Sequence, residues 1–221
     1  MREWPSFKAD FTLPMRFLHR GQGPGAVILL HGYQDHALSM TRRMGWLDAE
    51  LPFEILAVNA PFPVPVWKTD GFVEAYSWYF RDTSRDIMIV HPSTSAQRVS
   101  ELVREQLQPG TPITLFGFSQ GGYLAPFVAK FLPETRAIIA VGSGYPPEPY
   151  AGLSKNIKVF ALHGEQDDRW PLASSQAAHQ KLLESGFTGE FHVIPALGHR
   201  VDVSLDPLIR RMALDSFRRP A

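Results

Sequence analysis

Short apolar runs recur along the chain, and stretches with a helical spacing of apolar positions lie between them. A strand that is covered on both faces has an almost unbroken apolar sequence, whereas a half-exposed strand alternates apolar and polar residues. Six runs are nearly unbroken and are predicted to be buried strands: 26–30, 54–58, 113–116, 137–141, 157–162 and 190–194. The pattern therefore predicts a buried, mostly parallel sheet.

Helical stretches separate these runs, and one long segment departs from the rhythm. Three stretches place their apolar residues on a single helical face: 95–107, 174–183 and 205–217. Strands that alternate with helices form a parallel sheet between two helical layers. Because no linker divides the chain, we expect one three-layer α/β domain over residues 1–221.

Residues 60–92 are irregular and rich in proline and aromatic residues, and loops of this length are often functional.

Composition narrows the range of partners and locations. Lysine plus arginine equals aspartate plus glutamate at 22 each, so the formal net charge is zero, which argues against a nucleic-acid partner. The chain has no cysteine, so neither a disulfide nor a thiolate nucleophile is available. The first 20 residues carry charges throughout, unlike a signal peptide, and no run approaches the roughly 18 apolar residues of a membrane span. We expect a cytoplasmic protein without stable membrane insertion.

The strongest chemical signal is the sequence Gly-Phe-Ser-Gln-Gly at 117–121, which follows a predicted strand and precedes a helical stretch at 123–131. This is the G-x-S-x-G pattern of a nucleophilic serine on a sharp strand-to-helix turn. The glycines on either side leave room for that turn, and the start of the helix favours developing negative charge near the serine. The pattern predicts Ser119 as the nucleophile; the alternative is an ordinary glycine-rich turn.

A serine hydroxyl needs a neighbouring base, and in this arrangement the acid and then the histidine follow the serine along the chain. His199 lies in a loop after the last predicted strand, where a base can reach over the sheet edge. The acid is expected just after the strand at 157–162, where Asp167 and Asp168 both fit by spacing and Glu165 is weaker. Two backbone N–H groups should stabilise the oxyanion: one from the residue after the nucleophile, which is Gln120, and one from the loop after the strand at 26–30, where Tyr33 is the best candidate.

Several motifs occur in one order along the chain: LLHGYQD, APFPVP, GFSQGGYLA, VGSGYP, LHGEQDDRWP and PALGH. Together they resemble the phospholipase/carboxylesterase family of small α/β-hydrolase-fold enzymes, which includes acyl-protein thioesterases and bacterial carboxylesterases. The resemblance extends from about residue 27 to residue 217. It implies Ser119 as nucleophile, His199 as base and Asp167 as acid, since the family pattern H-G-x-x-D is followed four residues later by a proline. It also implies that no cofactor is needed.

The substrate side departs from the family pattern. Arg169 and Trp170 stand where relatives have small apolar residues, and Trp-Tyr-Phe at 78–80 replaces Trp-Phe-Asp. We expect an aromatic pocket that favours short to medium acyl or aromatic esters, unless these side chains belong to the core. The side chains predicted to wall it are Trp67, Phe72, Trp78, Tyr79, Phe80 and Trp170.

The leading interpretation is a serine carboxylesterase that acts on a small-molecule ester. Thioesterase and lysophospholipase activities are the alternatives, and a homologue that binds ligands without turnover is a further one. A metal hydrolase built on His31, Asp35 and His36 lacks a recognised ligand signature, so no metal site is predicted. The oligomeric state is left open between monomer and homodimer.

Overall fold

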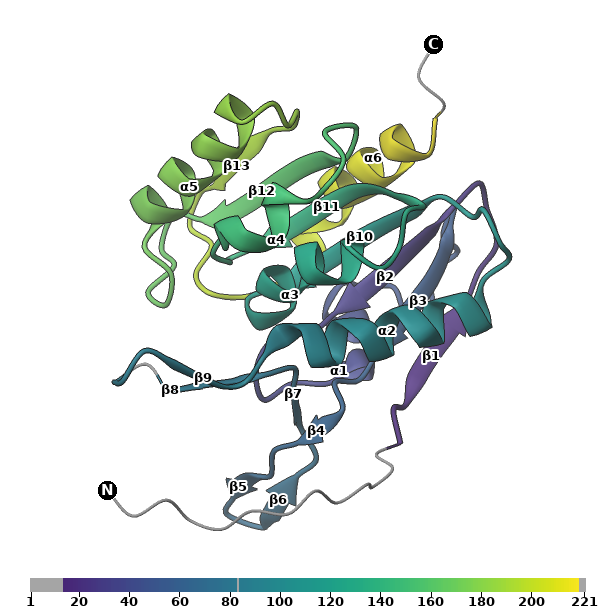
Figure 1. Cartoon of the computed structure of the whole chain (residues 1–221). Helices are drawn as coiled ribbons and strands as arrows, with labels where there is room; N and C mark the ends of the chain where they lie inside the picture. Colours follow the sequence, from purple (N-terminus) through teal and green to yellow (C-terminus); the bar gives the residue numbers. More distant parts are fainter. Residues whose placement is uncertain (1–13, 83, 219–221) are drawn as a thin grey trace, which may run out of the picture.

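The computed structural model describes residues 14–82 and 84–218. Its centre is a seven-stranded sheet that twists through the molecule (Figure 1). Six strands are parallel, and the first strand pairs with its neighbour in the antiparallel sense. Across the sheet the order is β1 (Phe17–Arg20), β3 (Glu54–Val58), β2 (Ala26–Leu30), β10 (Ile113–Phe118), β11 (Thr135–Val141), β12 (Lys158–Gly164) and β13 (Phe191–Ile194).

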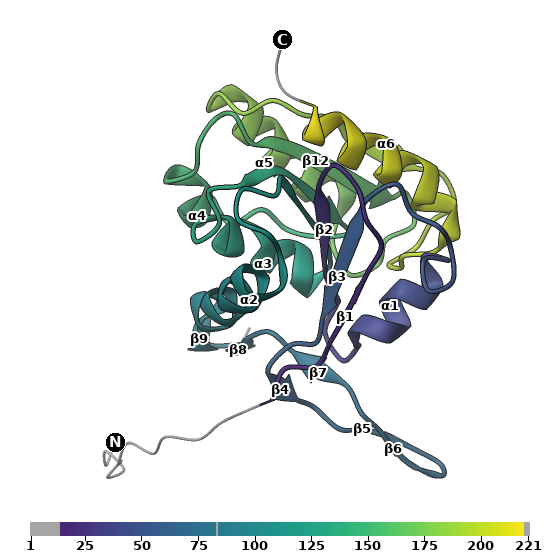
Figure 2. The same ribbon diagram turned by 90° about the vertical axis from the view of Figure 1, so that its right-hand side faces the viewer.

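Helices cover both faces of this sheet, as Figure 2 shows from the side. One face carries α2 (Pro92–Gln106), α3 (Gln120–Ala129), α4 (Pro147–Ala151) and α5 (Leu172–Glu184). The other carries α1 (Ala37–Arg43) and α6 (Asp206–Phe217), the latter preceded by a 3-10 turn at Val203–Leu205. The predicted three-layer α/β sandwich is therefore confirmed.

The core explains why the strands read as unbroken apolar runs. In β2, Ala26, Ile28 and Leu30 pack under α2 and α3, whereas Val27 and Leu29 face α1 and α6. All five side chains are buried, so neither face of the strand needs a polar residue. The six predicted strands all occur, with small changes at their ends.

Three elements of the sheet and its cover were absent from the prediction. Strand β1 is short and lies at the edge, where every second side chain is exposed, so it carries no buried run. Helix α1 has seven residues and α4 has five, which is too short for a clear helical spacing. Helix α2 begins three residues earlier than predicted because Pro92 occupies its first turn and the His91 ring accepts a hydrogen bond from the Ser93 N–H.

The segment at 60–92 is more ordered than its composition predicts. It forms three two-stranded sheets: β4 (Phe62–Pro63) with β7 (Tyr76–Ser77), β5 (Val66–Lys68) with β6 (Gly71–Val73), and β8 (Phe80–Asp82) with β9 (Ile87–Val90). Figures 1 and 2 show the β5–β6 hairpin extending away from the central sheet, while β8 and β9 form a separate arm on the α2 side.

No helix in residues 14–82 and 84–218 is long and apolar enough to cross a bilayer. The prediction that the chain lacks a signal peptide depends on its first 20 residues, and residues 1–13 lie outside the described part.

Candidate active site

Ser119 stands on a sharp turn between β10 and α3. Its backbone has φ 51° and ψ −112°, a conformation that residues other than glycine rarely adopt. A Cβ atom on Gly117 would lie 2.4 Å from the Gly121 carbonyl, and one on Gly121 would lie 2.0 Å from the Leu30 carbonyl oxygen. Only glycine fits at these two positions, so the G-x-S-x-G spacing is a steric requirement of the turn.

The structure brings Ser119, His199 and Asp167 into one hydrogen-bonded chain. His199 Nε2 lies 2.9 Å from Ser119 Oγ, and His199 Nδ1 lies 2.8 Å from Asp167 Oδ2. With the proton on Nδ1, the ring donates to the carboxylate and can accept the serine proton on Nε2. The three residues are separated by 80 and 32 positions along the chain and meet at the carboxyl edge of the parallel strands.

Asp167 is held so that it orients the imidazole. Its Oδ1 accepts hydrogen bonds from the backbone N–H groups of Arg169 and Trp170, both at 2.9 Å, which leaves Oδ2 for His199. Burial by itself would raise the pKa of the Asp167 carboxyl. The hydrogen bonds from Trp170, His199 and Arg169 outweigh that effect, and its pKa lies below the ordinary value. The Asp167 carboxylate is therefore deprotonated near neutral pH, where it accepts the imidazole N–H.

The two alternative acids lie elsewhere. The Asp168 side chain is 81% exposed and pairs loosely with Arg169 at 3.9 Å. Glu165 accepts a bond from the Ala196 N–H at 3.3 Å and does not contact His199. Spacing alone left these acids open, because the direction of a side chain in a turn depends on the local backbone.

The two residues whose backbone N–H groups are predicted to bind an oxyanion both lie near Ser119. Gln120 is the first residue of α3, so its N–H has no partner within the helix. Tyr33 follows β2, and both residues line the same pocket as Ser119. The positive end of α3 adds to the favourable field at this point.

A buried network holds the Tyr33 loop in place. The His31 ring lies 2.7 Å from the Gly32 carbonyl oxygen through Nδ1 and accepts the Ala60 N–H at 3.0 Å through Nε2. The Trp78 indole donates to the His31 carbonyl at 2.8 Å. Burial lowers the pKa of His31 to about 4, so its imidazole is neutral in the folded protein near pH 7.

A pocket of about 340 Å³ opens directly over Ser119. Its wall consists largely of aromatic side chains, with one cation among the residues that line it: Tyr33, Tyr79, Phe80, Arg81, Ser119, Gln120, Tyr123 and Trp170. The volume falls at the lower end of the roughly 300–1,000 Å³ typical of small-molecule sites. A pocket of this size accommodates a small molecule.

The predicted aromatic wall is formed only in part. Trp170, Tyr79 and Phe80 line the pocket, but Trp67, Phe72 and Trp78 do not. Trp78 is completely buried and belongs to the core. Trp67 and Phe72 lie on the β5–β6 hairpin, where they pack on each other and are 76% and 63% exposed. Composition could not separate the two groups, because the direction of an aromatic side chain depends on the tertiary fold.

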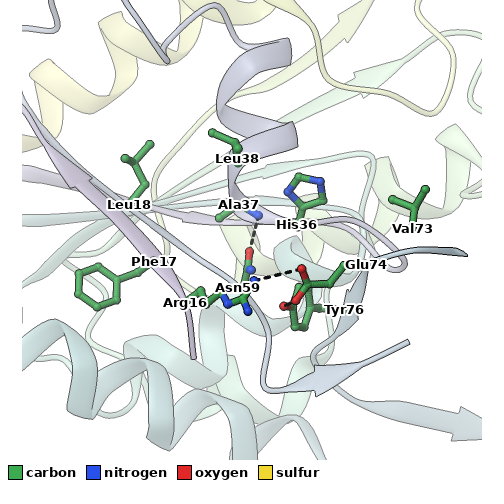
Figure 3. A pocket seen from close by; sticks show the side chains of 10 residues that line it. All are labelled: Arg16, Phe17, Leu18, His36, Ala37, Leu38, Asn59, Val73, Glu74 and Tyr76. Atoms are coloured by element: carbon green, nitrogen blue, oxygen red, sulfur yellow. Dashed lines mark hydrogen bonds and ion pairs between the residues drawn. The ribbon is translucent and has the colours of Figure 1, made fainter. Parts of the chain in front are cut away.

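A larger pocket, of about 400 Å³, lies between β1, the start of α1 and β7 (Figure 3). Arg16 and Glu74 form an ion pair of 3.1 Å across it, and Asn59 Oδ1 accepts the Ala37 N–H at 2.7 Å. Its wall contains no hydroxyl paired with an imidazole, unlike the pocket over Ser119. We therefore place the candidate active site at Ser119, although that pocket is smaller.

Two features of the site were missed in the sequence. Gly142 has φ +52°, and a Cβ there would lie 2.9 Å from Asp167 Oδ2 and 3.3 Å from His199 Nδ1, so glycine lets the acid and base approach. The Gln120 side chain accepts the Trp78 N–H at 2.9 Å and donates to the Tyr79 carbonyl at 2.8 Å. These bonds fix the start of the β8 arm to the serine turn. The VGSGYP motif marks Gly142, but nothing local marks a contact across 42 positions.

The side chains considered for a metal are used for structure. His31 makes the hydrogen bonds described above, Asp35 pairs with Arg43, and the His36 ring accepts the Ser39 N–H at the start of α1. Across residues 14–82 and 84–218, no three histidine, aspartate or glutamate side chains gather as metal ligands would.

Most of the chain is similar to one known enzyme family. The family model described as Phospholipase/Carboxylesterase matches residues 20–205. The carboxylesterase SOBER1 of Arabidopsis thaliana is 31% identical over 116 residues, which are 48% of this chain and 51% of that protein. A probable carboxylesterase of Oryza sativa, Os04g0669500, is 28% identical over 48% of this chain and 44% of its own length. These alignments thus span about half of the curated relatives.

Solved structures match over much more of the chain. The esterase PE8 is 25% identical and superposes with a TM-score of 0.67 over 94% of this chain and 99% of its own. The acyl-protein thioesterase 2 of Zea mays is 18% identical, with a TM-score of 0.70 over 94% of this chain and 100% of that chain. At that identity the likeness to the maize protein concerns the fold alone.

Proposed function

The chain belongs to the phospholipase/carboxylesterase family, and from that premise we propose that it is a serine esterase that hydrolyses carboxylic esters through an acyl-enzyme. The observation that carries the proposal is the hydrogen-bonded chain from Ser119 Oγ through His199 to Asp167. Its Ser119 end lines a pocket that is open to a small molecule. A serine hydroxyl becomes nucleophilic when a neutral imidazole accepts its proton, and this geometry supplies that base.

In the proposed mechanism, Ser119 Oγ attacks the ester carbonyl carbon while its proton passes to His199 Nε2. The backbone N–H groups of Tyr33 and Gln120 donate to the oxyanion of the tetrahedral intermediate. Collapse of that intermediate breaks the bond to the alcohol, which takes the proton from His199. The carboxylate of Asp167 stabilises the imidazolium that exists between these steps.

Deacylation follows the same route with water in place of the alcohol. His199 accepts a proton from the water molecule as its oxygen attacks the acyl carbon, and it then returns a proton to Ser119. The products are a carboxylic acid and free enzyme. Because one imidazole acts as base and then as acid in each half, no cofactor takes part in this scheme.

The pocket supports short to medium acyl or aromatic groups as the preferred substrates. Its volume of about 340 Å³ leaves little room for a long chain, and aromatic walls favour flat or compact groups. Thioester hydrolysis is a second candidate, supported by the fold that the chain shares with the maize acyl-protein thioesterase. The family description supports a lysophospholipase activity in the same way. A homologue without turnover would not need the strained serine turn.

The test compares wild-type protein with Ser119→Ala on p-nitrophenyl acetate and butyrate. We expect kcat to fall at least about a thousandfold in the variant, since removing the nucleophile leaves only binding and oxyanion contacts. Wild type, but not the variant, should also be labelled by a fluorophosphonate. Equal turnover in the two proteins, or no labelling of wild type, would contradict the proposal. The cytoplasmic location and the homodimer stay predictions from the sequence.

A further inference from the structure

The pocket over Ser119 contains a charge that ester hydrolysis itself does not use. Of the eight described residues that line it, Arg81 is the one with a charged side chain. Arg81 lies in β8, whose start is tied to the serine turn by the Gln120 side chain. A guanidinium is always protonated near neutral pH and donates in a planar fork that suits carboxylate and phosphate oxygens.

The guanidinium is available to a ligand because its present partner is weak. Arg81 pairs with Asp86, which lies on the same β8–β9 arm, and the two side chains are 41% and 79% exposed. An ion pair so open to water contributes little free energy. An anionic ligand group in the pocket can therefore replace the Asp86 carboxylate at low cost.

The other residues that line the pocket present donors and carry no negative charge. The Glu148 carboxylate acts on Tyr123 from outside this lining and is paired with Lys130 at 2.8 Å. The rings of Tyr79 and Tyr123 lie 5.4 Å apart, and both residues line the pocket beside Arg81. Burial raises the pKa of both phenols, so they keep their protons and can donate to an anion. The Asp167 carboxylate accepts three hydrogen bonds, and these donors partly offset its charge and so limit its repulsion of a second anion.

We propose that Arg81 forms an anion subsite, and that the preferred substrates are esters carrying a carboxylate or phosphate group away from the scissile bond. This inference rests on the proposed esterase function and specifies its substrate class. Asp86 competes with the substrate anion for the guanidinium. The Arg81 side chain thus determines specificity and takes no part in the bond-breaking steps.

The test measures the ratio of kcat/KM for an anionic ester to that for a neutral ester of matched length. The first pair is p-nitrophenyl hemiadipate and p-nitrophenyl hexanoate, with the negative charge on the acyl side. The second pair is a 1-acylglycerol 3-phosphate and the monoacylglycerol with the same short acyl chain, with the charge on the alcohol side. Spontaneous hydrolysis is subtracted with Ser119→Ala.

In Arg81→Gln we expect the ratio to fall about tenfold, because a hydrogen bond to a charged group is lost. The fall should appear mainly in KM, and raising the ionic strength should reduce the wild-type ratio. Asp86→Asn should raise the ratio roughly two- to fivefold, since the competing carboxylate is gone. Arg85→Gln is the matched control. Arg85 lies on the same arm, is 77% exposed, pairs with Asp82 and does not line the pocket, so its ratio should not change.

The pair of esters that responds identifies the side on which the anion lies. Equal ratios in wild type and Arg81→Gln for both pairs would overturn the anion subsite, while hydrolysis that depends on Ser119 would leave the esterase function standing. An equal fall in Arg85→Gln would reduce the effect to general surface charge and would also overturn the subsite. Failure of the wild type to hydrolyse any of the four esters would count against both proposals.

Discussion

The hydrogen bonds of Asp167 lead to a sharp prediction for Asp167→Asn. In the wild type, Oδ1 accepts two backbone N–H groups at 2.9 Å and Oδ2 accepts the imidazole N–H at 2.8 Å. The two backbone donors will bind the single oxygen of the amide, so the amide NH2 must face His199. That NH2 is a donor, and the imidazole can accept it only with its own proton on Nε2.

With the proton on Nε2, the imidazole can no longer accept the proton of Ser119 across the 2.9 Å contact. The same change of tautomer in a Ser-His-Asp triad lowers kcat by about 10⁴. We therefore expect a fall of that size for Asp167→Asn on p-nitrophenyl butyrate, with the fold preserved because the backbone bonds to the oxygen remain. Circular dichroism and the unfolding midpoint check the fold, and steady-state kinetics give kcat.

The neighbouring Asp168→Asn is the matched control, since its side chain is 81% exposed and does not touch the imidazole. It should keep kcat within about a factor of two, as expected for a surface substitution. The reasoning would be refuted if Asp167→Asn kept more than about a tenth of wild-type activity, or if Asp168→Asn lost as much.

Two further predictions concern stability. Burial lowers the pKa of His31 from 6.5 to about 4 in the folded protein. Between pH 6.5 and 4 the unfolded chain therefore binds more protons than the folded one, and the folded state loses stability as the pH falls through this range. The loss amounts to about 3 kcal/mol, and urea unfolding at several pH values should show a shallower pH slope for His31→Gln than for wild type; equal slopes would contradict this. Trp78→Phe removes the donor to the buried His31 carbonyl and should cost about 1–3 kcal/mol in unfolding free energy, whereas Trp67→Phe, on the exposed hairpin, should stay within about 0.5 kcal/mol. Equal unfolding midpoints for the two tryptophan variants would show that the hydrogen bond from Trp78 to His31 does not contribute to the unfolding free energy.

The pattern of the sequence was sufficient for the six buried strands of the sheet and for the longer helices that cover it. Buried strands such as β2 and β11 contain unbroken apolar runs because helices cover both of their faces, so the run predicts the burial. The serine turn was equally readable, since the glycines at 117 and 121 are required by contacts shorter than any Cβ could tolerate. Short or edge elements, such as β1 and α4, carry too few buried positions to leave a pattern.

The substrate side could be predicted from the sequence only in part. Trp78 and Trp67 occur in the same aromatic segment, yet one is wholly buried and the other is 76% exposed. The difference depends on hydrogen bonds and packing between residues far apart, such as the indole of Trp78 with the carbonyl of His31. Aromatic composition predicts that many of these side chains are buried, but it does not show which of them lie in the core, which line the pocket and which stay exposed on the hairpin.

The sequence by itself determined the six buried strands, the turn that carries Ser119 and the loop that carries His199, because each depends on neighbours within a few residues. Spacing left Asp167 and Asp168 open as the acid, and the family resemblance favoured Asp167, which the structure turns toward the imidazole. Tertiary structure alone decided that Gly142 makes room for the pair and that Arg81 enters the pocket. Those outcomes depend on side-chain directions set by contacts between distant segments, and such contacts leave no local periodicity in the chain.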